Sequence, residues 1–207
     1  MTEYAAEALS AEQVLRMRAT FEPLTQAVRD LIDAVIRSEA DDNQAAAARA
    51  EIESATARLR SRQLDGHFGA RRVVGGEPVA WGNAATGLRN PLAPPVVVKR
   101  ERPGTVSADL CLGAAYEGPP GHVHGGYCAL ILDHLLGEVA SGPDNPRFTG
   151  TLRLRYMRAT PLGVVHAEAR IERIDGVKTY AVGQLSDADG ATIEVEGVFI
   201  QPKWARG

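Results

Sequence analysis

The sequence predicts an α+β fold in which a curved antiparallel sheet wraps around one long helix, with a helical hairpin as an N-terminal extension. Three observations support this prediction. Residues 10–62 are poor in glycine and rich in Ala, Glu, Arg and Leu, a composition that favours helices. A single further helix is expected to begin near Gly125. The runs that follow it are typical of strands separated by turns, without alternation of strand and helix.

The N-terminal hairpin is expected within residues 1–65. Ser10 and Gln13 form a capping-box pattern, after which apolar residues recur in steps of three and four. These apolar residues are Val14, Met17, Phe21, Leu24, Val28, Leu31 and Val35. We therefore expect one stripe of the first helix to be covered by its own domain or its hairpin partner, with Pro23 as a candidate kink. Residues 41–43 break and restart the helix, and the second helix has a weaker apolar face.

A connecting segment at residues 66–95 is expected to lead into a C-terminal domain at residues 96–207. The connecting segment is rich in Gly, Pro and Asn, and we expect one short strand in it at most. In the C-terminal domain, strands are expected at residues 96–98, 106–112, 148–157, 164–174, 179–186 and 192–200. Short connections between consecutive strands predict that these strands are antiparallel neighbours.

Composition and charge exclude several classes of function. The chain has 207 residues and a formal net charge of −3, with 23 Lys and Arg scattered among 26 Asp and Glu. Nucleic acid is therefore not expected as a partner. The N-terminus lacks the positive charge of a signal peptide, and no apolar run approaches the ~18 residues that span a membrane. We expect a cytoplasmic protein in which Cys111 and Cys128 stay reduced and packed in the core.

Residues 122–133, with the sequence His-Val-His-Gly-Gly-Tyr-Cys-Ala-Leu-Ile-Leu-Asp, contain the most informative chemistry. A helix that begins at Gly125 presents unpaired N–H groups and the positive end of its dipole to an oxygen that gains negative charge. Gly125 and Gly126 would let a substrate carbonyl approach the backbone, and a tight turn is the alternative explanation. Asp133 has apolar neighbours, so its carboxylate must be paired, shifted in pKa or used chemically, unless it faces solvent.

Helical geometry separates the two ends of this motif. Gly125 and Asp133 are eight residues apart, which corresponds to about 12 Å of helix rise and a rotation of roughly 80°. A base or nucleophile has to lie within about 3 Å of the reacting atoms, so one helix cannot bring both residues to the same carbonyl. If both act in one reaction, they come from two chains. This predicts a composite site at a homodimer interface.

The run Gly-Pro-Pro-Gly-His-Val-His-Gly-Gly at residues 118–126, with Asp133 and residues 149–156 after it, resembles the hotdog-fold acyl-CoA thioesterases. In particular, it is similar to the branch of the phenylacetyl-CoA thioesterase and the human thioesterase-superfamily members, over about residues 96–202. The resemblance implies a hotdog fold, hydrolysis of acyl-CoA and a homodimer or homotetramer. Coenzyme A is then part of the substrate, and no separate cofactor is expected.

The resemblance also implies roles for single residues. The Gly125 amide polarises the thioester carbonyl, and His124 lies beside it to shape the site or to assist the leaving thiol. Asp133 of the facing subunit acts as general base on water or as nucleophile. Thr149, sixteen residues beyond Asp133, matches the hydroxyl that holds the water or the carboxylate.

Contacts with the rest of the substrate are less well specified. Many relatives carry Asn or Gln where this chain has Gly118, and His122 is the candidate substitute for that contact. Arg158, at the end of an expected strand, is a candidate partner of the coenzyme A phosphates, and Lys178 or Arg100 would serve as well. The His-x-His pair at residues 122–124 fits no strong zinc signature, so no metal is expected.

Two other functions stay open. A hotdog dehydratase or hydratase would use His124 and Asp133 as acid and base on the acyl chain. A non-catalytic acyl-CoA-binding protein would result if the change at Gly118 removed activity. The sequence does not determine the preferred acyl chain, the choice between dimer and tetramer, the role of the hairpin, or the choice between base and nucleophile for Asp133.

Overall fold

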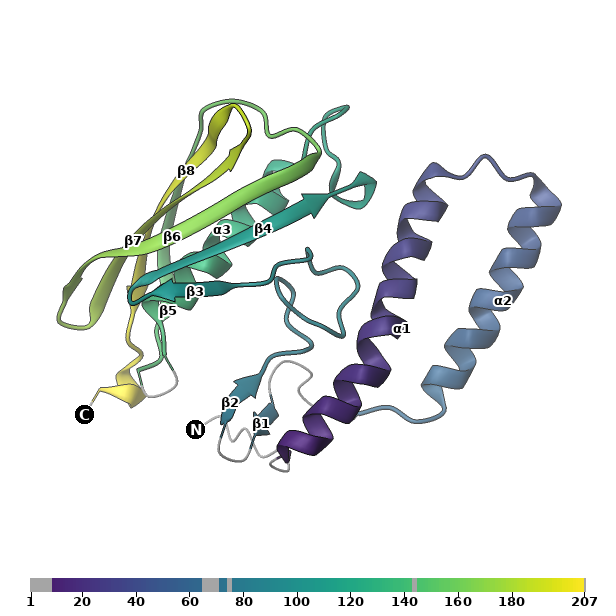
Figure 1. The fold of residues 1–207 in the computed structure, drawn as a ribbon, viewed down its shortest axis with the longest axis horizontal. Helices are drawn as coiled ribbons and strands as arrows, with labels where there is room; N and C mark the ends of the chain where they lie inside the picture. Colours follow the sequence, from purple (N-terminus) through teal and green to yellow (C-terminus); the bar gives the residue numbers. More distant parts are fainter. Residues whose placement is uncertain (1–8, 65–70, 74–75, 143–144, 207) are drawn as a thin grey trace.

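The computed structural model describes residues 9–64, 71–73, 76–142 and 145–206 (Figure 1). The predictions about the first eight residues, including the expected lack of a signal peptide, lie outside the described residues. In the described ranges, no helix is both long enough and apolar enough to cross a lipid bilayer.

Two helices form the expected N-terminal hairpin. Helix α1 spans Ala11–Arg37, and helix α2 spans Asp42–Arg60. The predicted capping box is present, because Gln13 N donates to Ser10 Oγ while Ser10 N donates to Gln13 Oε1. A second capping box begins at Asp41 and starts α2. The two caps satisfy backbone N–H groups that a helix start would otherwise leave unpaired.

Only the first of these helices is covered by the rest of the chain. The apolar stripe of α1 is half-buried along residues 14–31, Val35 is exposed, and Pro23 does not interrupt the helix. The guanidinium of Arg89 stacks over the Phe21 ring, 3.5 Å from its centroid. Helix α2 lies on the far side of α1 from the sheet and buries none of its residues (Figure 1).

The connecting segment contains two short strands where at most one was expected. Strand β1 (Arg71–Val73) pairs antiparallel with strand β2 (Gly76–Val79). Residues 81–93, after β2, form successive turns that lie between α1 and the C-terminal domain (Figure 1). Tyr116 Oη donates to Ala93 O over 3.1 Å and anchors the last of these turns.

A six-stranded antiparallel sheet forms the C-terminal domain, in the order β3-β4-β6-β7-β8-β5. Its strands are β3 (Lys99–Arg102), β4 (Thr105–Leu112), β5 (Phe148–Tyr156), β6 (Gly163–Asp175), β7 (Lys178–Asp187) and β8 (Gly190–Ile200). The predictions for β4 to β8 are confirmed to within two residues. The expected strand at residues 96–98 is wrong, because Val96 turns into the core with its N–H bonded to Pro94 O.

The connection from β5 to β6 is not a hairpin, although its short length predicted one. Strand β5 pairs with β8 at the edge of the sheet, whereas β6 pairs with β4 and β7. Residues 157–162 instead lie against the loop that precedes helix α3 (Gly125–Ala140). There, Val123 N donates to Thr160 O over 2.9 Å. The β6–β7 and β7–β8 connections are the expected tight turns, with φ of 53° at Gly176 and 110° at Gly190.

Helix α3 (Gly125–Ala140) packs against the sheet and contacts every strand from β4 to β8. It begins at the predicted residue. Its side chains and the inward-facing side chains of the strands form the core, in which Ile131, Leu132, Leu135 and Leu136 are fully buried. Each such side chain contributes about 1.5–3 kcal/mol of hydrophobic free energy. The predicted α+β class, a sheet around one helix with an N-terminal hairpin, is confirmed.

Candidate functional site

The start of α3 leaves one backbone N–H group available. His124 is the N-cap residue, and its Nδ1 accepts a hydrogen bond from Gly126 N over 3.0 Å. The next two amides, those of Tyr127 and Cys128, donate to His124 O. Within the described part of the chain, Gly125 N–H has no partner. Because it lies at the positive end of the helix dipole, this amide is suited to an oxygen that gains negative charge.

The bond to Gly126 also fixes the proton on the His124 ring. A neutral imidazole has one donor and one acceptor nitrogen, and Nδ1 of His124 is the acceptor. The proton is therefore on Nε2, which is free to donate to a group bound at the helix start. In His122, Nδ1 is instead the donor nitrogen, because it lies 2.9 Å from Pro120 O, which can only accept.

Gly118 is glycine because His124 occupies the space beside it. A Cβ atom at residue 118 would lie 2.8 Å from Cα and 2.9 Å from Cβ of His124, closer than such atoms approach in proteins. The Asn or Gln that many relatives carry at this position does not fit without a shift of His124. His122 is half-buried in the same loop, and its role as the substitute stays a prediction.

Tyr156 is a residue of this region that the sequence did not identify. Its Oη donates to Gly125 O over 3.0 Å, and its ring would lie 3.2 Å from a Cβ atom at Gly125. A side chain at residue 125 would therefore press on this ring. The signal available in the sequence was the period of β5, which places Tyr156 on the same face as Leu152 and Leu154. No local pattern indicated that this face reaches the start of α3.

Asp133 and Thr149 are in direct contact. Thr149 Oγ1 donates to Asp133 Oδ1 over 2.9 Å, and the aspartate is half-buried on α3. Among the described residues, Asp133 Oδ2 has no hydrogen-bond partner, so it is available to water. The register of β5 against β8 shifts between Thr149 and Thr151, at Gly150. A glycine inside a strand is a typical signal for such a bulge, which redirects the neighbouring side chain.

The candidate catalytic residues therefore form two groups. His124, Gly125 and Tyr156 lie at the start of α3, and Asp133 and Thr149 lie two turns along the helix. Along β5, Thr149 and Tyr156 are separated by seven residues, or about 23 Å of extended strand. Strand β5 is one of the two edge strands of the sheet, so both groups lie beside an edge that no other described strand pairs with (Figure 1).

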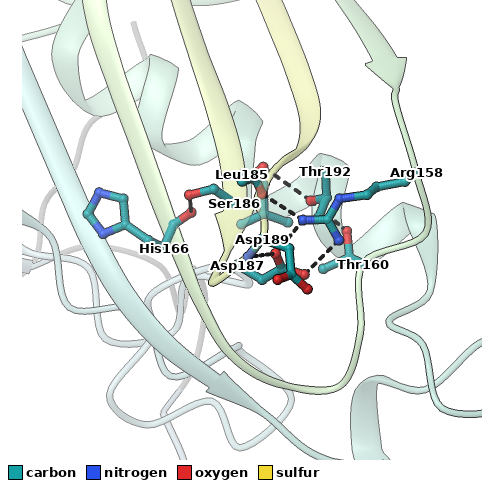
Figure 2. A network of polar contacts seen from close by, with 9 residues as sticks. Arg158, Thr160, His166, Leu185, Ser186, Asp187, Asp189 and Thr192 are labelled. Carbon is teal, nitrogen blue, oxygen red and sulfur yellow. Dashed lines mark hydrogen bonds and ion pairs between the residues drawn. The ribbon is translucent and has the colours of Figure 1, made fainter.

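Arg158, the candidate partner of the coenzyme A phosphates, is held by the β7–β8 turn (Figure 2). Its Nη1 donates to Asp187 Oδ2 over 2.8 Å, and its Nη2 bonds to Asp187 Oδ1 and to Gly190 O. The guanidinium lowers the pKa of Asp187 to about 2. Arg158 thus has few N–H groups left for a phosphate, and this role stays a prediction.

Thr160 connects the histidine loop to the same part of the sheet (Figure 2). Its hydroxyl donates to Thr192 Oγ1 over 2.9 Å, and Thr192 donates in turn to Leu185 O. The Thr160 carbonyl accepts from Val123 N, one residue before His124. Thr160 and Thr192 are both buried, so this chain of hydrogen bonds is shielded from water. No pattern in the sequence indicated these hydrogen bonds.

The remaining reactive side chains lie outside these two groups. Burial raises the pKa of Cys128, which suits the predicted apolar packing rather than a nucleophile. Cys111 is exposed on β4, so the prediction that it is a core residue is wrong. Burial lowers the pKa of His134, whose Nε2 lies 3.4 Å from Glu138 Oε1. In the described ranges, no three His, Cys, Asp or Glu side chains gather in a group that could hold a metal ion.

A family model and a solved structure both relate this chain to thioesterases. Residues 120–194 match the Thioesterase superfamily. The crystal structure of a thioesterase superfamily protein is 34% identical to this chain, with a TM-score of 0.77 over 87% of this chain and 95% of that one. This coverage is larger than the C-terminal domain at residues 96–207 alone.

Two curated relatives are more distant. Acyl-coenzyme A thioesterase THEM4 of Xenopus laevis is 33% identical over 95 residues, which are 44% of this chain and 43% of that protein. Acyl-coenzyme A thioesterase THEM5 of Homo sapiens is 28% identical over 103 residues, which are 47% of this chain and 42% of that protein. The chain thus spans less than half the length of these two relatives.

Proposed function

Because the chain belongs to the thioesterase superfamily, we propose that it hydrolyses acyl-CoA thioesters to a free acid and coenzyme A. The two curated relatives act on acyl-coenzyme A and support this substrate class. The observation that carries the proposal is the hydrogen bond from Thr149 to Asp133, which leaves one carboxylate oxygen free for water. A carboxylate held in this way is suited to general-base or nucleophilic catalysis.

Gly125 N–H binds the thioester carbonyl oxygen. Negative charge develops on this oxygen as the carbonyl carbon is attacked, so the interaction is stronger in the transition state than in the substrate. His124, with its proton on Nε2, lies beside this amide and donates a hydrogen bond to the sulfur as the carbon–sulfur bond breaks. The thiolate leaves and takes up the proton that was removed from water. The free amide and the fixed histidine proton support these two roles.

Asp133 of one chain acts at the carbonyl bound by the partner. As a general base, it takes a proton from water while the water oxygen attacks the thioester carbonyl carbon. As a nucleophile, it would attack that carbon itself, expel the coenzyme A thiolate and form an anhydride that water then opens. Two copies meet along the edge strand β5, so that Gly125 of one chain faces the partner's Asp133.

Release of free thiol from a panel of acyl-CoA substrates tests the activity, and substitution of Asp133 tests the mechanism. Asp133→Asn and Asp133→Ala are expected to lower kcat by about 100-fold or more, the scale of losing a positioned base. Asp109→Asn is the matched control, because Asp109 is an exposed, ion-paired aspartate on β4 outside both site groups. A folded Asp133→Ala protein with near-normal turnover would contradict the assignment.

The same panel separates the rival functions. A dehydratase or hydratase would change the absorbance of an enoyl thioester without releasing thiol. A binding protein would hold acyl-CoA tightly with no turnover, and Asp133→Ala would leave its affinity unchanged.

A further inference from the structure

Both helices of the N-terminal hairpin expose large apolar side chains. Helix α2 buries no side chain, and α2 lies on the outer side of α1 (Figure 1). Six of the large apolar side chains that are exposed in the described part of the chain belong to the hairpin and its end: Leu15, Val35, Ile36, Ile52, Leu59 and Leu64. A helix of this length is only marginally stable in water unless another surface covers it.

Part of this surface forms a groove at the base of the hairpin. The base groove has a volume of about 620 Å³ and lies between the middle of α1 and the C-terminal end of α2. Its walls are apolar and include Phe21, Leu24, Val28, Leu59 and Leu64. The charged side chains that line it are Arg58, Arg62 and Arg89, and no carboxylate is among its described lining residues.

The opposite end of the hairpin is apolar as well, but its charge is opposite to that of the base groove. This tip, residues 30–42, exposes Val35 to 62% and Ile36 to 53%. It carries the carboxylates of Asp30, Asp33, Glu39, Asp41 and Asp42 and the single cation Arg37. Arg37 is paired with Asp33 over 3.3 Å, so the tip is strongly negative. The hairpin therefore has an apolar, positive groove at one end and an apolar, negative tip at the other.

We infer that the base groove binds the tip of the hairpin from a second copy of this chain. Two hairpins then pack antiparallel around a twofold axis and form a four-helix bundle. The twofold axis makes the groove–tip contact occur twice, with opposite charges at each end. A chain cannot fill its own groove, because α1 continues without a break from the groove to the tip.

The dimensions of the hairpin agree with this arrangement. Leu24 in the groove and Val35 at the tip are eleven residues apart, or about 16 Å along the helix. The twofold axis then passes midway between them, near Arg29 and Asp30 of α1. This interface is separate from the β5 edge and does not depend on the proposed activity.

The mass of the full-length protein in solution, measured by sedimentation equilibrium across a concentration series, tests the inference. Val35→Glu combined with Ile36→Glu is expected to weaken the hairpin contact by about 100-fold, because acidic groups replace the apolar side chains that enter the groove. The assembly should then have half the mass of the wild-type assembly. Ile174→Glu is the matched control, since Ile174 is 60% exposed on β6 and should leave the mass unchanged.

A charge exchange identifies which surfaces meet. Arg58→Glu with Arg62→Glu should halve the mass, as should Glu39→Lys with Asp42→Lys, and the four substitutions together should restore it. Restoration occurs only if the base groove of one copy contacts the tip of another.

Three results would overturn the inference: a monomeric wild-type protein, an unchanged mass in the tip variant, or no restoration by the charge exchange. In the last case, a rise in melting temperature with added laurate would assign the groove to an acyl ligand instead. Thiol release by wild-type protein is measured separately, so a failure of the proposed activity is distinguished from a failure of the hairpin contact.

Discussion

Two glycines determine how closely other groups approach the start of α3. Gly125 allows the Tyr156 ring to lie against the helix, and Gly118 allows His124 to lie against the preceding loop. In both cases a Cβ atom would meet neighbouring atoms rather than open space. The geometry around the free Gly125 amide therefore depends on the lack of a side chain at residues 118 and 125, as well as on the His124 and Tyr156 side chains beside them.

Gly118→Ala is expected to destabilise the protein and to lower its turnover. The added Cβ meets two atoms of His124, and overpacking of this kind costs about 1–3 kcal/mol. Urea denaturation measures the loss of stability, and thiol release measures the loss of activity. Gly142→Ala provides the control, because a Cβ atom there meets nothing within 4 Å. Equal stability of the two variants would show that His124 is not held against Gly118.

Thr149→Val is expected to lower kcat/KM by about tenfold, the effect of losing one hydrogen bond to a charged group. Valine has the same shape as threonine but cannot donate to Asp133. Thr149→Ser keeps the hydroxyl and should retain most of the activity. Thr149 is exposed, so both variants should unfold at the same urea concentration as the wild type. Equal kcat/KM values for the valine and serine variants would remove Thr149 from the site.

Local sequence patterns predicted some of these residues and missed others. The glycine pair and the spacing to Asp133 lie within one helix, so their geometry follows from the helical repeat. Thr149 was placed through the family resemblance, and the structure adds its hydrogen bond to Asp133. Tyr156 and Thr160 act through contacts with distant parts of the chain, and no short-range pattern encodes such contacts. Their roles became visible only once β5 and residues 157–162 were placed beside α3.

At the scale of elements, the segment between β5 and β6 has two functions. It crosses from the edge strand β5 to the interior strand β6, and it supports the histidine loop through the bond from Val123 N to Thr160 O. Arg158 and Thr160 fix this segment to the β7–β8 hairpin through Asp187 and Thr192 (Figure 2). The position of the Gly125 amide is therefore tied to the β7–β8 turn.

Asp187→Asn is expected to reduce the sensitivity of the fold to acid. Arg158 lowers the pKa of Asp187 to about 2, whereas an aspartate in an unfolded chain titrates near ~3.9. A lowered pKa contributes stability above the unfolded value, and this contribution disappears as the pH falls from about 4 to about 2. The variant should be less stable than the wild type at pH 7 and should lose less stability on acidification.

Urea denaturation at a series of pH values measures this difference. Asp109 has a pKa of about 2 as well, because of Lys99 and His166. Asp109→Asn should therefore reduce the acid sensitivity further when it is combined with Asp187→Asn. Identical pH profiles for wild type and Asp187→Asn would show that the pair with Arg158 does not stabilise the fold.

The elements themselves were predicted well where their signals are local. The turns at Gly176 and Gly190 require positive φ, which glycine adopts readily, and both hairpins were expected there. The pairing of β5 with β8 was not expected, because strand order depends on packing around α3 and not on connection length. The run at residues 96–98 has the composition of a strand but turns into the core after Pro94 and Pro95.

At the scale of the whole molecule, the two groups of candidate catalytic residues lie apart in one chain and along the same free edge. In the described part of a single copy, no catalytic carboxylate lies beside the free Gly125 amide, and no free helix-start amide lies beside Asp133. An edge strand with unpaired N–H and C=O groups is also a common place for a second chain to join a sheet. These observations support a site that two copies complete together.

Mixing two inactive variants tests this arrangement. Asp133→Ala removes the carboxylate, and Gly125→Pro removes the amide hydrogen at a helix position where proline is tolerated. The proline ring would press on the exposed Tyr156 ring, which has room to move. In a mixed dimer, one site has both defects, and the other combines an intact Gly125 with the partner's intact Asp133. If each variant alone is inactive, an equal mixture refolded together should regain about a quarter of wild-type turnover, because half of the dimers are mixed and each has one good site. A mixture that stays inactive, while wild-type protein refolded in the same way recovers its activity, would mean that each chain works alone.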